Sequence, residues 1–185
     1  MTVDSRSFRN TIGLFATGIS VVASEIDGQI HAMTANAVSS LSLNPTLMLF
    51  CPSKKASLSR FVNDMPGFSV NFLREDQQAL SSYFAGVWQE ALPPPFRFVP
   101  AQCAPRLEGA LASVNCTMHQ VVDGGDHWLV IGQVMDLHQG IEPHRPLLFF
   151  KGTYRAVDFS ISTPAPDLAE VTHEPAHVFY DSWQA

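Results

Sequence analysis

Two tight-turn signals, each placed between strand-like runs, constrain the fold of this chain most strongly. Strand-like runs of β-branched and apolar residues occupy positions 19–24, 29–38, 110–122 and 127–137. The dipeptide Asp27-Gly28 joins the first two runs, and the sequence Asp-Gly-Gly-Asp at 123–126 joins the last two. Aspartate followed by glycine favours the backbone conformation that tight hairpin turns need. We therefore expect two antiparallel hairpins.

The rest of the pattern adds further strands and only short helices. We expect strands at 46–52, 68–73 and 147–157, and helices beginning near Ser7 and spanning about 57–63 and 74–84. The segment 86–106 is irregular and carries a run of prolines, which neither continue a helix nor fit a central strand. About seven strands joined mainly by tight turns predict a mainly β fold, an antiparallel barrel or sandwich.

Length and charge limit the classes of function. The chain has 185 residues, of which 46% are apolar and 15% charged, so we expect one globular domain. The net charge of −6 argues against a nucleic-acid partner. No apolar run is long enough to span a membrane and no signal-sequence core opens the chain, so we expect no membrane partner and a cytoplasmic location. Neither a GxGxxG nor a GxxxxGK sequence occurs, which argues against Rossmann and P-loop sites.

The cysteines and histidines form no metal or disulfide pattern. Cys51, Cys103 and Cys116 lack paired spacing, so we expect reduced thiols. Cys51 and Cys116 are interpreted as small core residues, with a reactive Cys51 as the less favoured alternative. The seven histidines make no HExxH pair, and we predict no metal site. No GxSxG elbow is present, and the spacing selects no Ser-His-Asp triad.

A row of short polar side chains lies within 31–45, between two strand-like runs. Its members are Thr34, Asn36, Ser39, Ser40 and Ser42, interleaved with apolar residues. Such a surface suits a flat, hydrogen-bonding ligand. The alternative is a solvated loop with ordinary turn chemistry, and the residues alone do not decide between the two.

Two further features could carry chemistry. The sequence Ser-Lys-Lys-Ala-Ser at 53–57 precedes a predicted helix, whose free amides, with Ser57 and Lys54 or Lys55, would bind a phosphate. The alternative is a capped surface helix with solvated lysines. His127, at the tip of the second hairpin, could stack on a cofactor, donate a hydrogen bond or exchange a proton. The alternative is an ordinary turn histidine.

Short fragments along the chain occur together in the order of one known family. They include Leu-Phe-Ala-Thr-Gly at 14–18, His-Ala-Met-Thr-Ala-Asn at 31–36, Ser-Leu-Ser-Leu-Asn-Pro at 40–45, Phe-Ser-Val-Asn-Phe-Leu at 68–73, Gly-Asp-His at 125–127 and Ile-Gly-Gln-Val at 131–134. From about Ser7 to Arg155 the chain resembles the short-chain flavin reductases of two-component monooxygenases, in the flavin-reductase-like group.

The resemblance implies an antiparallel split β-barrel, the FMN-binding, Greek-key type, with a few short flanking helices. This domain would comprise residues 1–157, and the tail at 158–185 would dock on the barrel or the dimer mate, or be a disordered end. The implied protein is a homodimeric enzyme that reduces FMN or FAD with NADH or NADPH and supplies reduced flavin to a partner monooxygenase. Two alternatives stay open: a flavin- or haem-binding module without turnover, and a reductase of a corrinoid or ferric complex.

The resemblance also implies roles for individual positions. Beside the edge of the flavin ring system it places Thr34, Ala35 and Asn36, followed along the flavin by Ser39 and Ser40. The region that holds the flavin phosphate matches Cys51, Ser53, Lys54, Lys55 and Ser57. It places Phe84 and Tyr154 near the pocket. It places His127 beside the nicotinamide as the catalytic residue. One departure is Ala32, which stands where many relatives have glycine.

Overall fold

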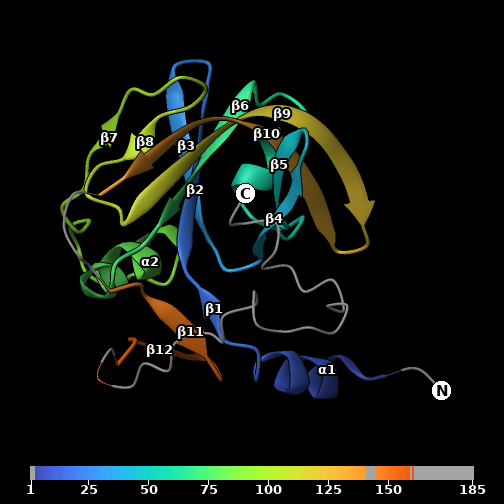
Figure 1. Cartoon of the computed structure of the whole chain (residues 1–185). Helices are drawn as coiled ribbons and strands as arrows, with labels where there is room; N and C mark the ends of the chain where they lie inside the picture. The colour runs from blue at the N-terminus through green and yellow to red at the C-terminus, as the bar shows by residue number, and fades with distance from the viewer. Residues whose placement is uncertain (1–2, 141–144, 159, 161–185) are drawn as a thin grey trace, which may run out of the picture.

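The structure is a computed structural model that describes residues 3–140, 145–158 and 160. Two α-helices, two 3₁₀ helices and twelve strands make up the described part (Figure 1). The elements in order are α1 (Ser5–Ile12), β1 (Thr17–Gly18), β2 (Ser20–Ile26), β3 (Gln29–Ala35), β4 (Val38–Leu43), β5 (Thr46–Phe50), η1 (Leu58–Phe61), β6 (Gly67–Phe72), η2 (Glu75–Gln77), α2 (Gln78–Phe84), β7 (Phe98–Val99), β8 (Arg106–Leu107), β9 (Ala112–Gly124), β10 (His127–Gln139), β11 (Leu148–Phe150) and β12 (Thr153–Arg155).

A seven-stranded antiparallel sheet forms the body of the protein. Its strand order is β3-β2-β6-β9-β10-β5-β4, and the long strands β9 and β10 arch over the other strands (Figure 1). The two edge strands are β3 and β4, and only Asn36 and Ala37 connect them. Because this connection is so short, the two edges approach each other there and the sheet curls into an open barrel. The predicted mainly β, split-barrel fold is confirmed.

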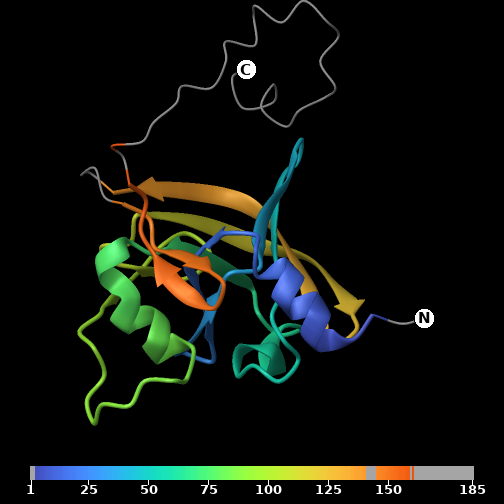
Figure 2. The same cartoon turned by 90° about the horizontal axis from the view of Figure 1, so that it is seen from below.

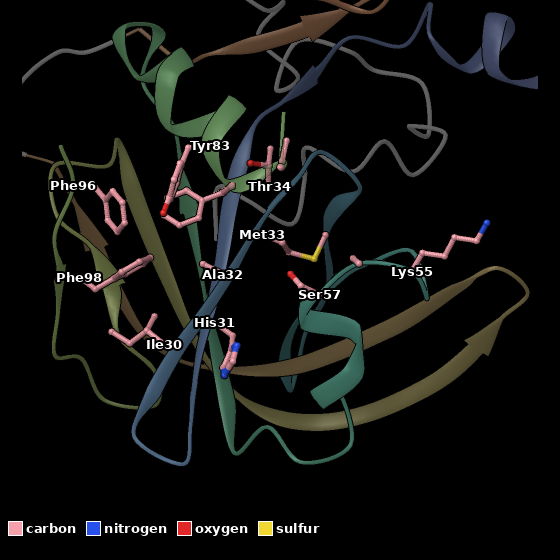
Figure 3. Close-up of a pocket in the computed structure, with 14 residues that line it drawn as sticks. Ile30, His31, Ala32, Met33, Thr34, Lys55, Ser57, Tyr83, Phe96 and Phe98 are labelled. Atoms are coloured by element: carbon pink, nitrogen blue, oxygen red, sulfur yellow. The ribbon is translucent and has the colours of Figure 1, made fainter. Parts of the chain in front are cut away.

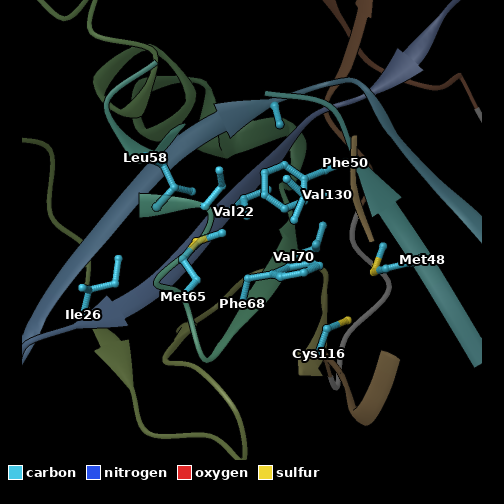
Figure 4. Close-up of a cluster of buried hydrophobic side chains, with 12 residues drawn as sticks. Val22, Ile26, Met48, Phe50, Leu58, Met65, Phe68, Val70, Cys116 and Val130 are labelled. Carbon is cyan, nitrogen blue, oxygen red and sulfur yellow. The ribbon is translucent and has the colours of Figure 1, made fainter. Parts of the chain in front are cut away.

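The core of the barrel is built from the inward-facing residues of these strands (Figure 4). Phe50 and Phe68 are fully buried, with ring centroids 4.9 Å apart in an edge-to-face arrangement. Val22, Val70 and Val130 are also fully buried around them. Each such side chain contributes roughly 1.5–3 kcal/mol when it leaves water. A second cluster, with Leu73, Leu80 and Leu107 among its members, packs α2 against the sheet.

The buried side chain of Asn71 links β6 to neighbouring strands and to β8. The amide nitrogen of Asn71 donates to Val21 O at 2.9 Å and to Ser69 Oγ at 3.0 Å. Its oxygen accepts hydrogen bonds from Leu107 N and Ser113 Oγ, both at 2.8 Å. All four hydrogen-bonding positions of the side chain are therefore used, as a buried amide requires.

Several predicted elements change in the structure. The single strand expected at 147–157 is a hairpin, β11–β12, because Lys151 and Gly152 both adopt positive φ, 51° and 73°, and turn the chain. The helix expected at 57–63 is only the 3₁₀ turn η1, and the helix expected at 74–84 is divided into η2 and α2. Strand β4 was not predicted, because its residues are mostly exposed and read as loop.

The N-terminal helix begins at Ser5, two residues before the expected start, and buries none of its side chains. Asp4 caps it by accepting hydrogen bonds from Arg6 N and Ser7 N, both at 3.0 Å. Its apolar residues Phe8 and Ile12 remain exposed, at 59% and 53%. The predicted tail lies outside the described residues apart from Asp158 and Ser160. Within the part of the chain that the structure describes, no helix has the length and apolarity to cross a membrane.

Candidate functional site

A cleft of about 870 Å³ opens between strand β3, the turn at 55–57 and the end of α2 (Figure 3). Residues 30–34 of β3 form one wall of it, with His31, Ala32 and Met33 at its middle. Figure 3 shows Phe98 and Ile30 at one end of the cleft and Lys55 at the opposite end. Its volume and its mixture of apolar walls with a few polar groups are typical of cofactor sites.

Four aromatic side chains form the wall at the end opposite Lys55. Tyr83 and Phe84 come from the last turn of α2, which ends before Gly86 with its positive φ of 74°. Phe96 and Phe98 come from the extended segment that follows. The ring centroids of Phe84 lie 5.1 Å from Tyr83, 5.0 Å from Phe96 and 5.9 Å from Phe98. Such a surface offers planar groups for stacking.

Thr34 lines the cleft and ties β3 to α2. Its hydroxyl donates to Ser81 O at 2.7 Å. The Ser81 hydroxyl in turn lies 2.9 Å from the Tyr154 hydroxyl, so β12 supports the same helix. Tyr154 does not line the cleft, and the structure places it behind α2 as a support. Because the Thr34 hydroxyl donates its proton to Ser81, it can act toward a ligand only as an acceptor.

The two neighbouring lysines at 54 and 55 have different surroundings. Lys54 Nζ lies 2.5 Å from Asp123 Oδ2 and 4.4 Å from the centre of the Trp128 ring. This lysine therefore clamps the β9–β10 hairpin and does not line the cleft. Lys55 is exposed at the end of the cleft beside Ser57. Of the residues predicted to hold a phosphate, Lys55 and Ser57 line the cleft, and the helix dipole expected beside them is absent because η1 has only four residues.

His127 lies at the start of β10, beside the segment that carries the lysines. Ser53 pairs with it as an isolated β-bridge, and Lys54 N donates to Asp126 O at 2.9 Å. His127 Nδ1 lies 2.7 Å from Asp126 Oδ1. The hydrogen bond to His127 holds the pKa of the Asp126 carboxyl below its usual value. The imidazole is half-exposed at the hairpin tip and does not line the cleft within one chain.

The other predicted residues lie around the cleft and not in its lining. Ala35 is buried, and Asn36 Nδ2 donates to Thr17 Oγ1 at 3.3 Å. Ser39 and Ser40 are exposed on the edge strand β4. Burial raises the pKa of the half-buried Cys51 thiol, which disfavours the reactive thiolate.

The sequence interpretation did not single out most of the cleft lining. The residues added by the structure are Ile30, His31, Ala32, Met33, Ala56, Tyr83, Ala85, Gly86, Phe96 and Phe98. Phe96 and Phe98 are separated by one residue, the spacing that puts two side chains on one face of an extended segment. That spacing was the one local signal in the sequence that could have predicted that Phe96 and Phe98 line the same surface. Among the described residues, no three His, Cys, Asp or Glu side chains gather as a metal site.

Comparison with known proteins identifies the family. Residues 12–158 match the family described as flavin reductase like domain. The chain belongs to the flavin reductase-like family. This reductase is 35% identical over 173 residues to the reductase subunit HsaB of a flavin-dependent monooxygenase from Rhodococcus jostii strain RHA1, covering 89% of this chain and 84% of that one.

A second relative and a solved structure agree with this assignment. An NADH-dependent flavin reductase from a Rhodococcus species is 35% identical over 153 residues, 81% of this chain and 85% of the relative. The solved flavin reductase PheA2 superposes with a TM-score of 0.78 at 40% identity, covering 84% of this chain and 99% of that chain. The predicted family, the enzyme class and the use of a flavin with a reduced nicotinamide are confirmed.

Proposed function

We propose that this reductase transfers a hydride from NADH or NADPH to FMN or FAD, and that the reduced flavin passes to a partner monooxygenase. The observation that carries the proposal is the cleft that has an aromatic wall at one end and the exposed amine of Lys55 at the other. A flavin has the same polarity, with a planar ring system at one end and a phosphate at the other. The relatives described as monooxygenase reductase components support the partner.

The residues of the cleft fit a flavin. Lys55 and the hydroxyl of Ser57 would hold the phosphate, because both are exposed at the cleft end and neither makes a hydrogen bond among the described residues through its side chain. The side chains of Ala32 and Met33 would support the ring, and Thr34 would accept a hydrogen bond from a ring N–H. Phe84 would close the far side of the ring.

When bound, the flavin supplies the hydride acceptor, and the protein supplies position. The β3 wall fixes the plane in which a ring can lie, because Thr34 anchors this strand to α2. The aromatic wall excludes water from one side of the cleft and offers a stacking surface to the second ring. Holding two rings face to face accounts for most of the catalysis that such a reaction needs from a protein.

A homodimer would bring the remaining predicted residues to the site. The exposed apolar residues Phe8, Ile12 and Phe15 of the N-terminal segment are unusual for an isolated surface. The β4–β5 hairpin projects from the body of the barrel (Figure 2) and exposes Leu41 and Leu43. We propose that both surfaces are covered by a second copy.

The predicted residues outside one chain's cleft would then serve across the interface. His127 would contact the nicotinamide, and the row from Ala35 and Asn36 to Ser39 and Ser40 would continue the flavin site. Cys51 and Ser53 would shape the backbone beside the phosphate. The three free thiols of Cys51, Cys103 and Cys116 fit a cytoplasmic location.

The test is to combine the purified protein with each flavin and each reduced nicotinamide. We expect binding of FMN or FAD to change the flavin spectrum, and NADH or NADPH to be consumed only when flavin is present. A protein that binds flavin without consuming nicotinamide would be a binding module. Consumption with a corrinoid or ferric complex, but not with free flavin, would identify a different acceptor.

A further inference from the structure

A second hollow continues from the aromatic end of the cleft. It has a volume of about 460 Å³ and lies between the β2–β3 hairpin and the segment 98–105. Ile30 and Phe98 line both the cleft and the hollow, so the two spaces share one boundary. The cleft therefore extends from Lys55 along β3 to Ile30 and Phe98, and the hollow lies on the other side of these two residues, with Glu25 in its lining.

Hydrogen bonds to the sheet fix the outer wall of the hollow. The Asn115 oxygen accepts from Cys103 N at 2.6 Å and from Ala104 N at 3.0 Å, and its amide donates to Ala104 O at 2.7 Å. Ser69 Oγ donates to Pro105 O at 2.6 Å. Asn115 and Ser69 are both buried. The wall is thus preorganised, which reduces the entropy lost when a ligand binds.

The chemistry of the hollow suits an adenosine. Its walls are mostly apolar, with Phe98, Pro100 and Pro105 as flat or rigid surfaces for a base. Glu25 is the one charged residue in the lining that the structure describes, and Gln102 is a second polar group. Arg97, next to Phe98, is held by Glu108, with Nε 2.6 Å from Oε2. A carboxylate accepts hydrogen bonds from ribose hydroxyls and repels a phosphate in the same place.

The position of the hollow indicates which of the two dinucleotides would place its adenosine there. The adenosine of FAD follows the flavin phosphate, and the proposed phosphate site is at Lys55, the end of the cleft away from the hollow. The adenosine of a nicotinamide dinucleotide extends from the nicotinamide, which stacks on the flavin ring near the aromatic wall. The hollow lies just beyond that wall.

We propose that the hollow beyond Phe98 binds the adenosine end of NADH, with Glu25 accepting a hydrogen bond from the ribose 2′-hydroxyl. Glu25 is then a specificity-determining residue that favours NADH over NADPH, because NADPH carries a phosphate at that position. This inference rests on the proposed function and adds to it the preferred nicotinamide. Glu25 is exposed on β2 opposite Ile30, so its replacement leaves the core untouched.

The test compares the unmodified protein with Glu25→Gln, Glu25→Lys and the control Glu90→Lys, at saturating FMN. Glu90 is an exposed acid outside both cleft linings. We expect the unmodified protein to favour NADH by at least about tenfold in kcat/KM. Glu25→Gln should raise KM for NADH about three- to tenfold with kcat unchanged, as expected when uniform binding is lost. Glu25→Lys should shift the preference toward NADPH, and Glu90→Lys should leave it unchanged.

Three results would overturn the inference. They are an unmodified protein that favours NADPH, an unchanged NADH-to-NADPH ratio in both Glu25 variants, and, in a separate titration of FAD at saturating NADH, an effect of Glu25→Gln on the KM of FAD without an effect on the KM of NADH. Titration of the unmodified protein with 5′-AMP gives a readout independent of turnover. Binding of 5′-AMP that is weakened by Glu25→Gln supports the adenosine site even if no flavin is reduced. Flavin reduction without binding of 5′-AMP contradicts the adenosine site and leaves the proposed reductase function unaffected.

Discussion

His127 Nδ1 lies 2.7 Å from Asp126 Oδ1 at the tip of the long β9–β10 hairpin. The carboxylate accepts a hydrogen bond from Nδ1–H, which leaves Nε2 as the ring nitrogen available to a ligand. The side chain of Asp126 is almost fully exposed, at 92%, so it does not contribute to packing in the core. The pair is therefore suited to orient the imidazole toward a ligand that arrives from outside this chain.

Replacing Asp126 with asparagine should affect the nicotinamide and not the flavin. We expect Asp126→Asn to raise KM for NADH about two- to fivefold, because the uncharged amide oxygen accepts a weaker hydrogen bond from His127 Nδ1 than the carboxylate does. The dissociation constant for FMN should stay unchanged. Nitrogen NMR of the His127 ring should show a smaller share of the Nδ1–H tautomer. An unaltered tautomer together with unaltered kinetics would remove Asp126 from the site.

Lys54 and Lys55 provide a matched pair for testing the phosphate site. We expect Lys55→Ala to weaken FMN binding about tenfold, equivalent to about 1.4 kcal/mol, and more so at low salt. Lys54→Ala should change FMN binding less than about twofold, because Lys54 is held by Asp123 and Trp128. Equilibrium titration of the flavin spectrum measures both. Equal losses in the two variants would show that the cleft end is wrongly assigned.

The clamp between Lys54 and Asp123 should open in acid. The hydrogen bond from Lys54, assisted by Gly125 N, lowers the pKa of the Asp123 carboxyl from its ordinary value of 3.8. A carboxyl whose pKa is lowered by folding stabilises the fold above its ordinary pKa, and this contribution is lost as pH falls through the lowered value. The protection factor of the hairpin-tip amides, which is the intrinsic exchange rate at each pH divided by the measured one, should therefore fall below about pH 4. The variant Asp123→Asn should show a low protection factor at every pH, and a protection factor that still falls below about pH 4 in Asp123→Asn would contradict this account.

Gly132 should not tolerate a side chain. An added Cβ would lie 2.5 Å from Phe68 Cζ and 2.7 Å from Cys116 Cβ, inside the main core. We expect Gly132→Ala to lower the free energy of unfolding by about 1–3 kcal/mol, which is the usual range for overpacking. Gly18→Ala, with no atom within 4 Å of the added Cβ, is the control and should change it by less than about 0.5 kcal/mol. Denaturant unfolding measures both, and equal stabilities would mean that the core is loosely packed.

Local signals in the sequence were enough to predict the main hairpins. Asp27-Gly28 and the turn before His127 mark chain reversals, because their residues favour the required backbone angles. Strand β4 was not predicted because most of its residues are exposed and give no apolar alternation. It is a strand because it pairs with β5. The hairpin β11–β12 was not predicted because the turn at Lys151 and Gly152 lacks the usual Asn-Gly or Asp-Gly signal.

The candidate site was only partly predictable, because it depends on contacts between distant segments. Lys54 and Lys55 are equivalent in the sequence, and only Asp123, on another hairpin, distinguishes them. Tyr83 and Phe98 meet β3 through the fold, with no periodicity that links them to it. Tyr154 was predicted near the pocket, and the structure shows that its hydroxyl contacts Ser81, which accepts a hydrogen bond from the cleft residue Thr34.

The most direct test of the central claim is the rate of FMN reduction by NADH under anaerobic conditions, followed by the bleaching of the flavin colour. We expect the protein to accelerate bleaching far above the protein-free rate, with a stoichiometry of one NADH per flavin. Lys55→Ala should need more FMN to reach the same rate. Bleaching no faster than in the protein-free mixture would contradict the account.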